Sequence, residues 1–264
     1  MAGDDDTRDP AYVVHGRPAA AEPDAGADLD RAPARAADVW LLLYGQLFKR
    51  VTHLLGGGFG TASYITFLAP AIVIMNAFFG ATWSGMAMIS DLDRDVLPRF
   101  LATPVSRSSL VISQIVRSAL IAVIQGAIIL AVSLALGVRV HTALLGWVVV
   151  LLAAALMNAA FAGLSQGIAL LVRKEATMIA IANFIGLPLF FLSTTLISIN
   201  QIPHWMRIAA KFNPVNWGVI SAREVVLTGT NWSSVGLHLA LLFALSVATA
   251  AFATWTFRAY QRTI

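Results

Sequence analysis

Three carboxylates stand close together on one short segment, at Asp91, Asp93 and Asp95. Acidic residues spaced in this way can hold a magnesium ion and a diphosphate, as membrane-embedded transferases require. Such a site needs further carboxylates on a facing helix, and the long apolar runs of this chain contain no Asp or Glu. We therefore expect a solvated loop here and keep a magnesium-dependent transferase as the alternative.

Other residue types that commonly do chemistry form no catalytic set. The five histidines lie far apart in the sequence and lack metal-ligand spacing. The chain has no cysteine, which excludes disulfides, thiolate metal sites and a cysteine nucleophile. Serine hydroxyls in apolar helices usually bond to their own backbone. We expect a protein that is not an enzyme by itself and that holds no metal or cofactor.

The source of energy for any transport would also lie outside this chain. Carriers driven by protons or sodium ions usually place Asp, Glu or His inside the membrane, and here only His238 lies within an apolar run, close to its start. The sequence contains no G-x-x-x-x-G-K-[ST] loop that could cradle ATP phosphates. A pump of this composition would depend on a separate ATPase.

The elements that carry these residues are predicted to be membrane-spanning helices. Of 264 residues, 58% are hydrophobic and 12% are charged, about half the charged share of a soluble domain. A helix needs roughly 20 apolar residues to cross a bilayer. Five runs with at most one charged residue or histidine meet this length: Tyr64–Ser90, Leu110–Leu136, Ala143–Val172, Ala176–Ile199 and Val235–Phe257.

The beginning of the chain differs from the rest. The first 38 residues hold nine acids against four arginines, and residues 1–36 are predicted to be a disordered acidic tail. Residues 37–264 then form one membrane domain. The run Val39–Phe48 is only ten residues long, so it is either a short sixth crossing or an amphipathic helix at the interface.

The distribution of basic residues only weakly predicts how the chain is oriented in the membrane. If the loop Asp91–Ser109 faces the cytoplasm, seven basic residues lie inside and six outside, which slightly favours that placement. The six on the outer side would be Lys49, Arg50, Arg139, Arg207, Lys211 and Arg223. The basic residues form no cluster with interleaved aromatics, so nucleic-acid binding is not expected.

The connection Asn200–Ser234 is predicted to contain a helix lying at the membrane surface. Pro203 can open it, Asn213-Pro214 ends it, and Trp205, Ile208, Ala209 and Phe212 form an apolar side. The segment is either an ordinary capping loop or part of a substrate gate.

Uncharged polar and small residues recur within the predicted crossings. The polar ones are Asn76, Gln125, Asn158, Gln166 and Asn183. They could line a path for an amphipathic molecule, but hydrogen bonds between helices are the favoured interpretation. Ala159, Gly163 and Gly167 form a stripe of small residues that lets a neighbouring helix approach closely.

Several strings share an order and spacing with one known family. They are YITFLAP at 64–70, WSGM at 83–86, DLDR at 91–94, RFLATPVSR at 99–107, LPLFFLS at 187–193, IPHWM at 202–206 and NPVN at 213–216. Together they resemble the ABC transporter type-2 permease family, particularly its daunorubicin-resistance type of drug exporter. The resemblance covers roughly residues 39–264.

This resemblance implies an architecture and a set of partners. It implies a half-bundle of six helices that pairs with a second permease and sits on cytoplasmic ATPase subunits, which carry the ATP and magnesium. It also implies a plasma-membrane protein with both termini in the cytoplasm, an outer re-entrant hairpin within Asn200–Ser234, and export of amphipathic drugs or lipids. The loop that docks on the ATPase maps to Asp91, Asp93, Arg94, Asp95, Arg99, Pro104 and Arg107.

The first crossing departs from the family pattern. Family members begin with an amphipathic helix and a full first crossing, whereas this chain has its acidic tail in that place. We expect a shortened first helix, and a scaffold that does not transport is the remaining alternative.

Overall fold

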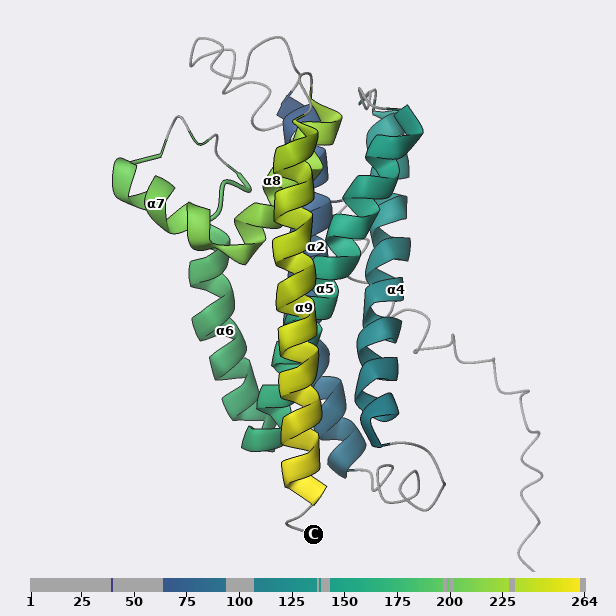
Figure 1. Cartoon of the computed structure of the whole chain (residues 1–264), viewed down its shortest axis with the longest axis vertical. Coiled ribbons are helices and arrows are strands. Elements are labelled where there is room, and N and C mark those ends of the chain that lie inside the picture. Colours follow the sequence, from purple (N-terminus) through teal and green to yellow (C-terminus); the bar gives the residue numbers. More distant parts are fainter. Residues whose placement is uncertain are drawn as a thin grey trace, which may run out of the picture.

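The computed structural model describes residues 39, 64–93, 107–136, 138, 143–196, 199, 202–227 and 231–261. Within this part of the chain all regular secondary structure is helical, and the remaining residues form turns, bends and short connections. The helices are α2 (Tyr64–Asp93), α4 (Arg107–Ala135), α5 (Ala143–Val172), α6 (Glu175–Phe191), α7 (His204–Phe212), α8 (Pro214–Val226) and α9 (Trp232–Gln261). Figure 1 shows the long helices standing side by side. The acidic tail 1–36 and all of the run Val39–Phe48 except Val39 lie outside the described residues.

Four helices are long and apolar enough to cross a membrane. Their candidate spans are Ile65–Ser90, Ser109–Ala135, Leu144–Val172 and Trp232–Ala259. These spans agree with four of the five predicted runs, so the prediction of an all-helical, multi-pass membrane protein is confirmed.

The fifth predicted run forms a shorter helix than expected. α6 ends at Phe191 rather than Ile199, and its 17 residues give a length of about 26 Å, less than the roughly 30 Å of a bilayer core. Polar residues explain this end, because the Ser193 amide and hydroxyl both donate to Phe190 O and close the last turn. The following residue, Thr194, bonds to another element instead of continuing the helix.

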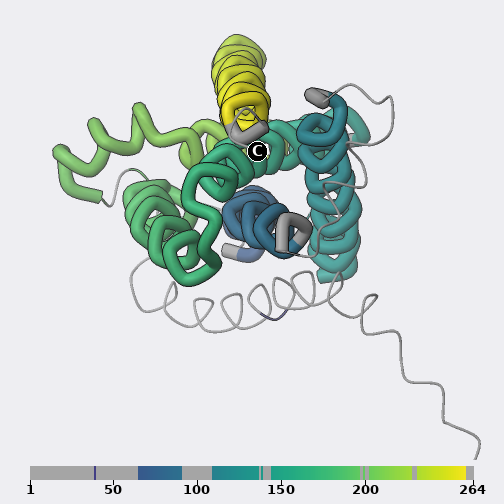
Figure 2. Tube along the Cα trace, turned by 90° about the horizontal axis from the view of Figure 1, so that it is seen from below, coloured from purple at the N-terminus to yellow at the C-terminus, as the bar shows by residue number. Residues whose placement is uncertain are grey.

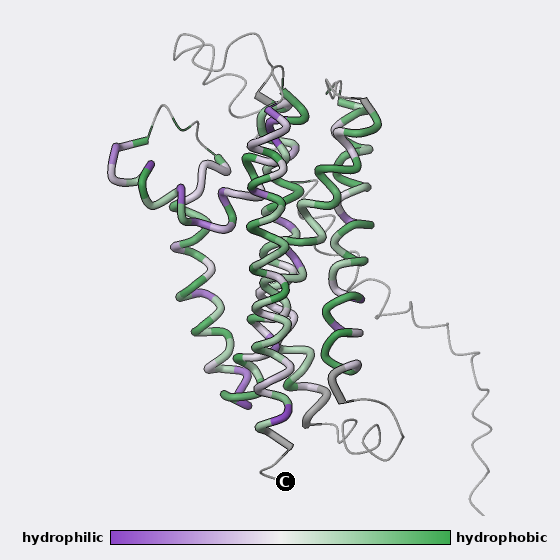
Figure 3. The backbone as a smooth tube through the Cα atoms, in the orientation of Figure 1, coloured by the Kyte–Doolittle hydropathy of each residue, from purple (hydrophilic) through white to green (hydrophobic). Residues whose placement is uncertain are grey.

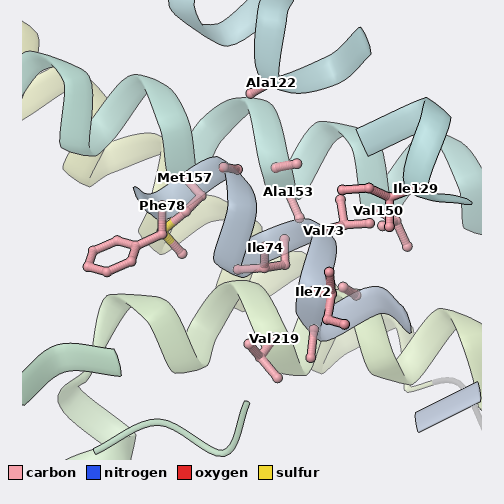
Figure 4. Packing of buried hydrophobic residues seen from close by; sticks show 14 of the residues in the cluster. Ile72, Val73, Ile74, Phe78, Ala122, Ile129, Val150, Ala153, Met157 and Val219 are labelled. Atoms are coloured by element: carbon pink, nitrogen blue, oxygen red, sulfur yellow. The ribbon is translucent and has the colours of Figure 1, made fainter. Parts of the chain in front are cut away.

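α2 lies at the centre of the bundle and supplies much of its core. In its most hydrophobic 18-residue stretch about 67% of the residues are buried, against 22% in the corresponding stretch of α9. Figure 4 shows Ile72, Val73, Ile74 and Phe78 of α2 among side chains from α4, α5 and α8. Viewed along the bundle in Figure 2, α2 is surrounded by α4, α5 and α6.

The outer faces of the long helices are strongly apolar. Figure 3 shows mostly hydrophobic colouring along α4 and α6. Large exposed side chains include Leu120 and Ile124 on α4 and Phe243 and Trp255 on α9. A soluble monomer rarely exposes so much contiguous apolar surface, whereas a lipid-facing surface requires it.

α7 and α8 form a helical hairpin at one end of the bundle, within the connection Asn200–Ser234. α7 begins after Pro203 and ends at Phe212, before Asn213-Pro214, as predicted. Its Trp205, Ile208 and Phe212 are exposed, which suits a helix at a membrane interface. α8 was not predicted as a separate element. It packs against α2, α5 and α9, and nine of its 13 residues are buried.

The opposite end of the bundle carries the last turn of α2, the first turn of α4 and the end of α9 (Figure 1). The connection predicted as Asp91–Ser109 is therefore shorter at both sides, since α2 continues to Asp93 and α4 begins at Arg107. The end of α9 and the α2–α4 connection share one end, as the predicted topology requires. The intervening residues 94–106 lie outside the described part.

Candidate functional site

An apolar cavity of about 300 Å³ lies between α2 and α6. All of its lining residues in the described chain are hydrophobic: Leu68, Ile72, Met75, Phe79, Leu187, Phe190, Phe191 and Leu196. Leu187 and Phe191 are also exposed, so the cavity lies next to the outer surface of the bundle. An aromatic contact joins α2 to α6 in the cavity wall, because the ring centres of Phe79 and Phe190 lie 5.5 Å apart.

The chemistry of this cavity selects by size and apolarity. An apolar cavity of about 150 Å³ accepts a benzene ring, so one of about twice that volume can hold a two-ring system or part of an acyl chain. The described lining offers aromatic faces that favour a flat ring. In size and polarity this lining suits an apolar group, and its described residues offer no group for catalysis.

The α6 wall of the cavity is hydrogen-bonded to the α7–α8 hairpin. Asn213, at the turn between the two helices, accepts a hydrogen bond from Val215 N at 2.9 Å and so caps α8. Its Nδ2 donates to Leu189 O of α6 at 2.6 Å. A single side chain therefore closes the hairpin turn and holds it against the wall of the cavity.

A second asparagine joins the hairpin to the segment that follows α6. Asn216 is almost fully buried, and its Oδ1 accepts hydrogen bonds from the Thr194 hydroxyl at 2.6 Å and the Thr194 amide at 3.2 Å. Its Nδ2 donates to Ala210 O of α7 at 3.0 Å. The Asn216 amide thereby links the end of α7 to the segment after α6 and satisfies the Thr194 amide, which lies outside any helix.

Arg223 of α8 is the buried cation of this junction, with an exposed fraction of 7%. Its Nε donates to Phe67 O at 3.1 Å, and its two terminal nitrogens donate to Thr194 O and Thr195 O. The guanidinium carbon lies 3.6 Å from the centre of the Phe67 ring. Carbonyl oxygens and an aromatic face together offset the cost of burying the charge.

α2 and α5 meet at a polar crossing within the bundle. Ser165 of α5 donates to Thr82 O at 2.6 Å and accepts from Gly85 N at 2.9 Å. Contrary to the expectation for serines in apolar helices, this hydroxyl bonds to another helix. A Cβ atom at Gly85 would lie 2.6 Å from Ser165 O, so the crossing requires glycine.

Ser165 also stands in the string Gly163-Leu164-Ser165-Gln166-Gly167, which has the G-x-S-x-G spacing of a nucleophile elbow and was overlooked in the sequence. An elbow needs a sharp strand-to-helix turn, and this string lies inside the continuous helix α5. The serine is a packing residue here.

The polar residues predicted in the crossings differ in their surroundings. Asn76 Nδ2 donates to Gln125 Oε1 at 2.9 Å, and Asn158 Nδ2 donates to Ala77 O at 3.0 Å, so these residues join α2 to α4 and α5. Gln166 is buried in α5, with no hydrogen-bond partner for its Oε1 among the described residues. Asn183 is exposed on α6 and bonds to its own helix at Ile179 O.

The small residues of α5 lie at its contact with α9 or close to it. A Cβ at Gly163 would lie 3.0 Å from the Thr249 backbone, and one at Gly167 would lie 2.5 Å from the Phe252 ring. Ala159 packs against the second core cluster, which includes Ala253 of α9.

Comparison with known proteins decides the family. The model of the family described as ABC-2 type transporter matches residues 36–227. The chain belongs to this family.

Several curated relatives carry transport names. A putative transport permease ycf38 from Pyropia yezoensis is 28% identical over 200 residues, which is 74% of this chain and 66% of that protein. The daunorubicin resistance ABC transporter permease protein DrrB1 of Streptomyces coeruleorubidus is 23% identical over 212 residues, 80% of this chain and 74% of the relative. A probable doxorubicin resistance permease protein, DrrC of Mycobacterium tuberculosis, is 22% identical over 188 residues, 71% of this chain and 65% of the relative. The chain thus spans about two thirds of the length of these relatives.

The ATPase-docking loop inferred from the ABC-2 resemblance is only partly described. The backbone places Asp91 and Asp93 in the last turn of α2 and Arg107 in the first turn of α4. Arg94, Asp95, Arg99 and Pro104 lie outside the described residues. In the described part of the chain, no group of three or more acidic or histidine side chains could hold a metal ion.

The sequence alone did not reveal the junction residues. Arg223 was counted as a basic residue of an outer loop, whereas it is buried within this ABC-2 bundle. A signal was present, because Asn213-Pro214 followed by a helix-forming stretch predicts a capped helix. Reading Pro214–Val226 as a helix would have placed Arg223 among valines and alanines.

Proposed function

We propose that this chain is the membrane-spanning permease subunit of an ATP-driven exporter that uses a separate ATPase subunit. Membership of the ABC-2 type transporter family carries this proposal. The sequence supports it, since no ATP-binding loop of the Walker type occurs in the chain and no Asp or Glu lies within the apolar runs.

The proposed cargo is an amphipathic drug or lipid. Two of the relatives are named for resistance to daunorubicin or doxorubicin. The α2–α6 cavity supports this class, because it offers about 300 Å³ of apolar space next to the lipid-facing surface. The apolar part of the cargo would enter this space from the bilayer while its polar part stays at the interface.

The proposed partners are two ATPase subunits and a second permease, either another copy or a sister chain, in the plasma membrane. The connection between α2 and α4 would dock on the ATPase, with both termini on the same cytoplasmic side. Asp91, Asp93, Arg94, Asp95, Arg99, Pro104 and Arg107 would form the docking surface.

Co-purification tests the partnership. The chain is extracted from native membranes in mild detergent, and the ATPase activity of the eluate is measured. An ATP-binding subunit should accompany the wild-type chain, and Arg94→Glu with Arg99→Glu should release it. Lys211→Glu, an exposed charge on α7 at the other end of the bundle, is the matched control and should retain it. A chain that elutes alone without ATPase activity would contradict the proposal.

A further inference from the structure

We propose that Arg223 is a positioning residue that fixes the α7–α8 hairpin and, through it, one end of the α2–α6 cavity. The hairpin position is a property of the folded chain by itself. This inference therefore does not depend on the proposed function.

The contacts of Arg223 reach two separate parts of the bundle. On one side, Nε donates to Phe67 O in the first turn of α2, and the Phe67 ring lies under the guanidinium. On the other side, the terminal nitrogens donate to the consecutive carbonyls of Thr194 and Thr195, which follow α6. α8 is therefore held to both walls by one planar group.

The same two segments supply the end of the cavity. Leu68 lines it and is the neighbour of Phe67, while Leu196 lines it and is the neighbour of Thr195. The spacing between these two lining residues is thus set by backbone groups that Arg223 holds. We therefore expect a shift of the guanidinium to change the spacing of Leu68 and Leu196.

Lysine cannot replace this arginine. A guanidinium presents donors in a rigid planar fork and stacks on an aromatic ring, whereas an ammonium is a compact point charge. A lysine ammonium therefore cannot donate to the carbonyls of both walls and cover the Phe67 ring at the same time. Asn213 and Asn216 still tie the hairpin to α6 and Thr194, so the variant chain should fold with a loosened junction.

Hydrogen–deuterium exchange on the full chain in nanodiscs measures this loosening without any transport. In Arg223→Lys and Arg223→Met, amides of α8, of residues 193–196 and of the first turns of α2 should exchange at least about tenfold faster, because the loss of even one hydrogen bond to a charged group shifts a local opening equilibrium by about that factor. Phe67→Leu keeps the hydrogen bonds and should give about a threefold increase. Lys211→Met, an exposed cation on the same hairpin, should change nothing.

The pattern of exchange decides the proposal. Faster exchange on both walls together, with α4 and α5 unchanged, is the expected result. Three results would overturn the proposal. They are faster exchange in α8 alone, an equal rise of exchange in every helix, and no change of exchange in Phe67→Leu and Arg223→Lys. If Arg223→Met does not fold, Phe67→Leu and Arg223→Lys still give one of these outcomes. A failure to find an ATPase partner would leave these results unaffected, so the two proposals fail separately.

Discussion

Asn76 of α2 donates a hydrogen bond of 2.9 Å to Gln125 of α4, and both side chains are more than nine-tenths buried. The bond joins the central helix to a helix with a largely lipid-facing surface. It also places two residues that could have lined a transport path in direct contact with each other.

A double-mutant cycle tests whether this pair is structural. Asn76→Leu and Gln125→Leu should each lower the unfolding midpoint in detergent, and the coupling between them should be about 0.6 kcal/mol and at most about 1.7 kcal/mol, as for other hydrogen bonds between membrane helices. The double variant should keep its transport rate. A normal fold with lost transport would instead place the pair on the substrate path.

Two glycines on different helices provide a matched pair of alanine substitutions. Gly85→Ala should destabilise the chain by about 1–3 kcal/mol, because its Cβ would lie 2.6 Å from the Ser165 backbone oxygen. Gly236→Ala should be neutral or stabilise α9 by up to about 1 kcal/mol, since nothing lies within 4 Å of its Cβ. Thermal unfolding of both variants measures the difference, and equal midpoints would show that the α2–α5 crossing is looser than described.

Asn213 performs two tasks that separate variants can distinguish. Asn213→Ser keeps a neutral side-chain acceptor that can cap α8 at Val215 N but loses the amide donor to Leu189 O. Asn213→Ala loses both and should cost about 1 kcal/mol more, the usual contribution of an N-cap. Exchange rates of α8 and of the last turn of α6 measure the two effects. If the two variants behave alike, the cap contributes nothing.

Filling the cavity tests its role in binding. Leu187→Trp adds bulk to a cavity-lining residue that is partly exposed, so the fold should tolerate it while the space shrinks. Doxorubicin binding to the purified chain should fall about tenfold or more, which corresponds to the loss of one buried apolar group. Leu120→Trp on the exposed face of α4 is the control and should bind normally. Unchanged doxorubicin binding in Leu187→Trp would show that the cavity is not the binding site.

The sequence predicted the long helices well because charge marks their ends. α5 begins at Ala143 and ends at Val172 as predicted, where Arg173 takes a left-handed conformation with φ 54° and the chain reverses. α6 was predicted too long because Leu196 to Ile199 is as apolar as a helix interior. Its true end depends on Thr194 bonding to Asn216, which is a contact between distant residues.

The candidate site was harder to predict than the fold. Periodicity identified the apolar side of α7 but could not say which basic residue turns inward, because Arg207, Lys211 and Arg223 look alike in an outer loop. The cavity arises from the spacing of α2 and α6, which a linear pattern does not encode. Small residues were informative, since Gly163 and Gly167 do meet α9 closely.

Reconstituted transport tests the central claim most directly. The chain and its co-purified ATPase are placed in proteoliposomes, and movement of doxorubicin and of a fluorescent phospholipid is followed with ATP and with a non-hydrolysable analogue. The account predicts ATP-dependent movement of at least one probe, reduced by Leu187→Trp and retained in Leu120→Trp. Equal movement with ATP and with the analogue, in a complex that hydrolyses ATP, would contradict the assignment of this chain as an export permease for such molecules.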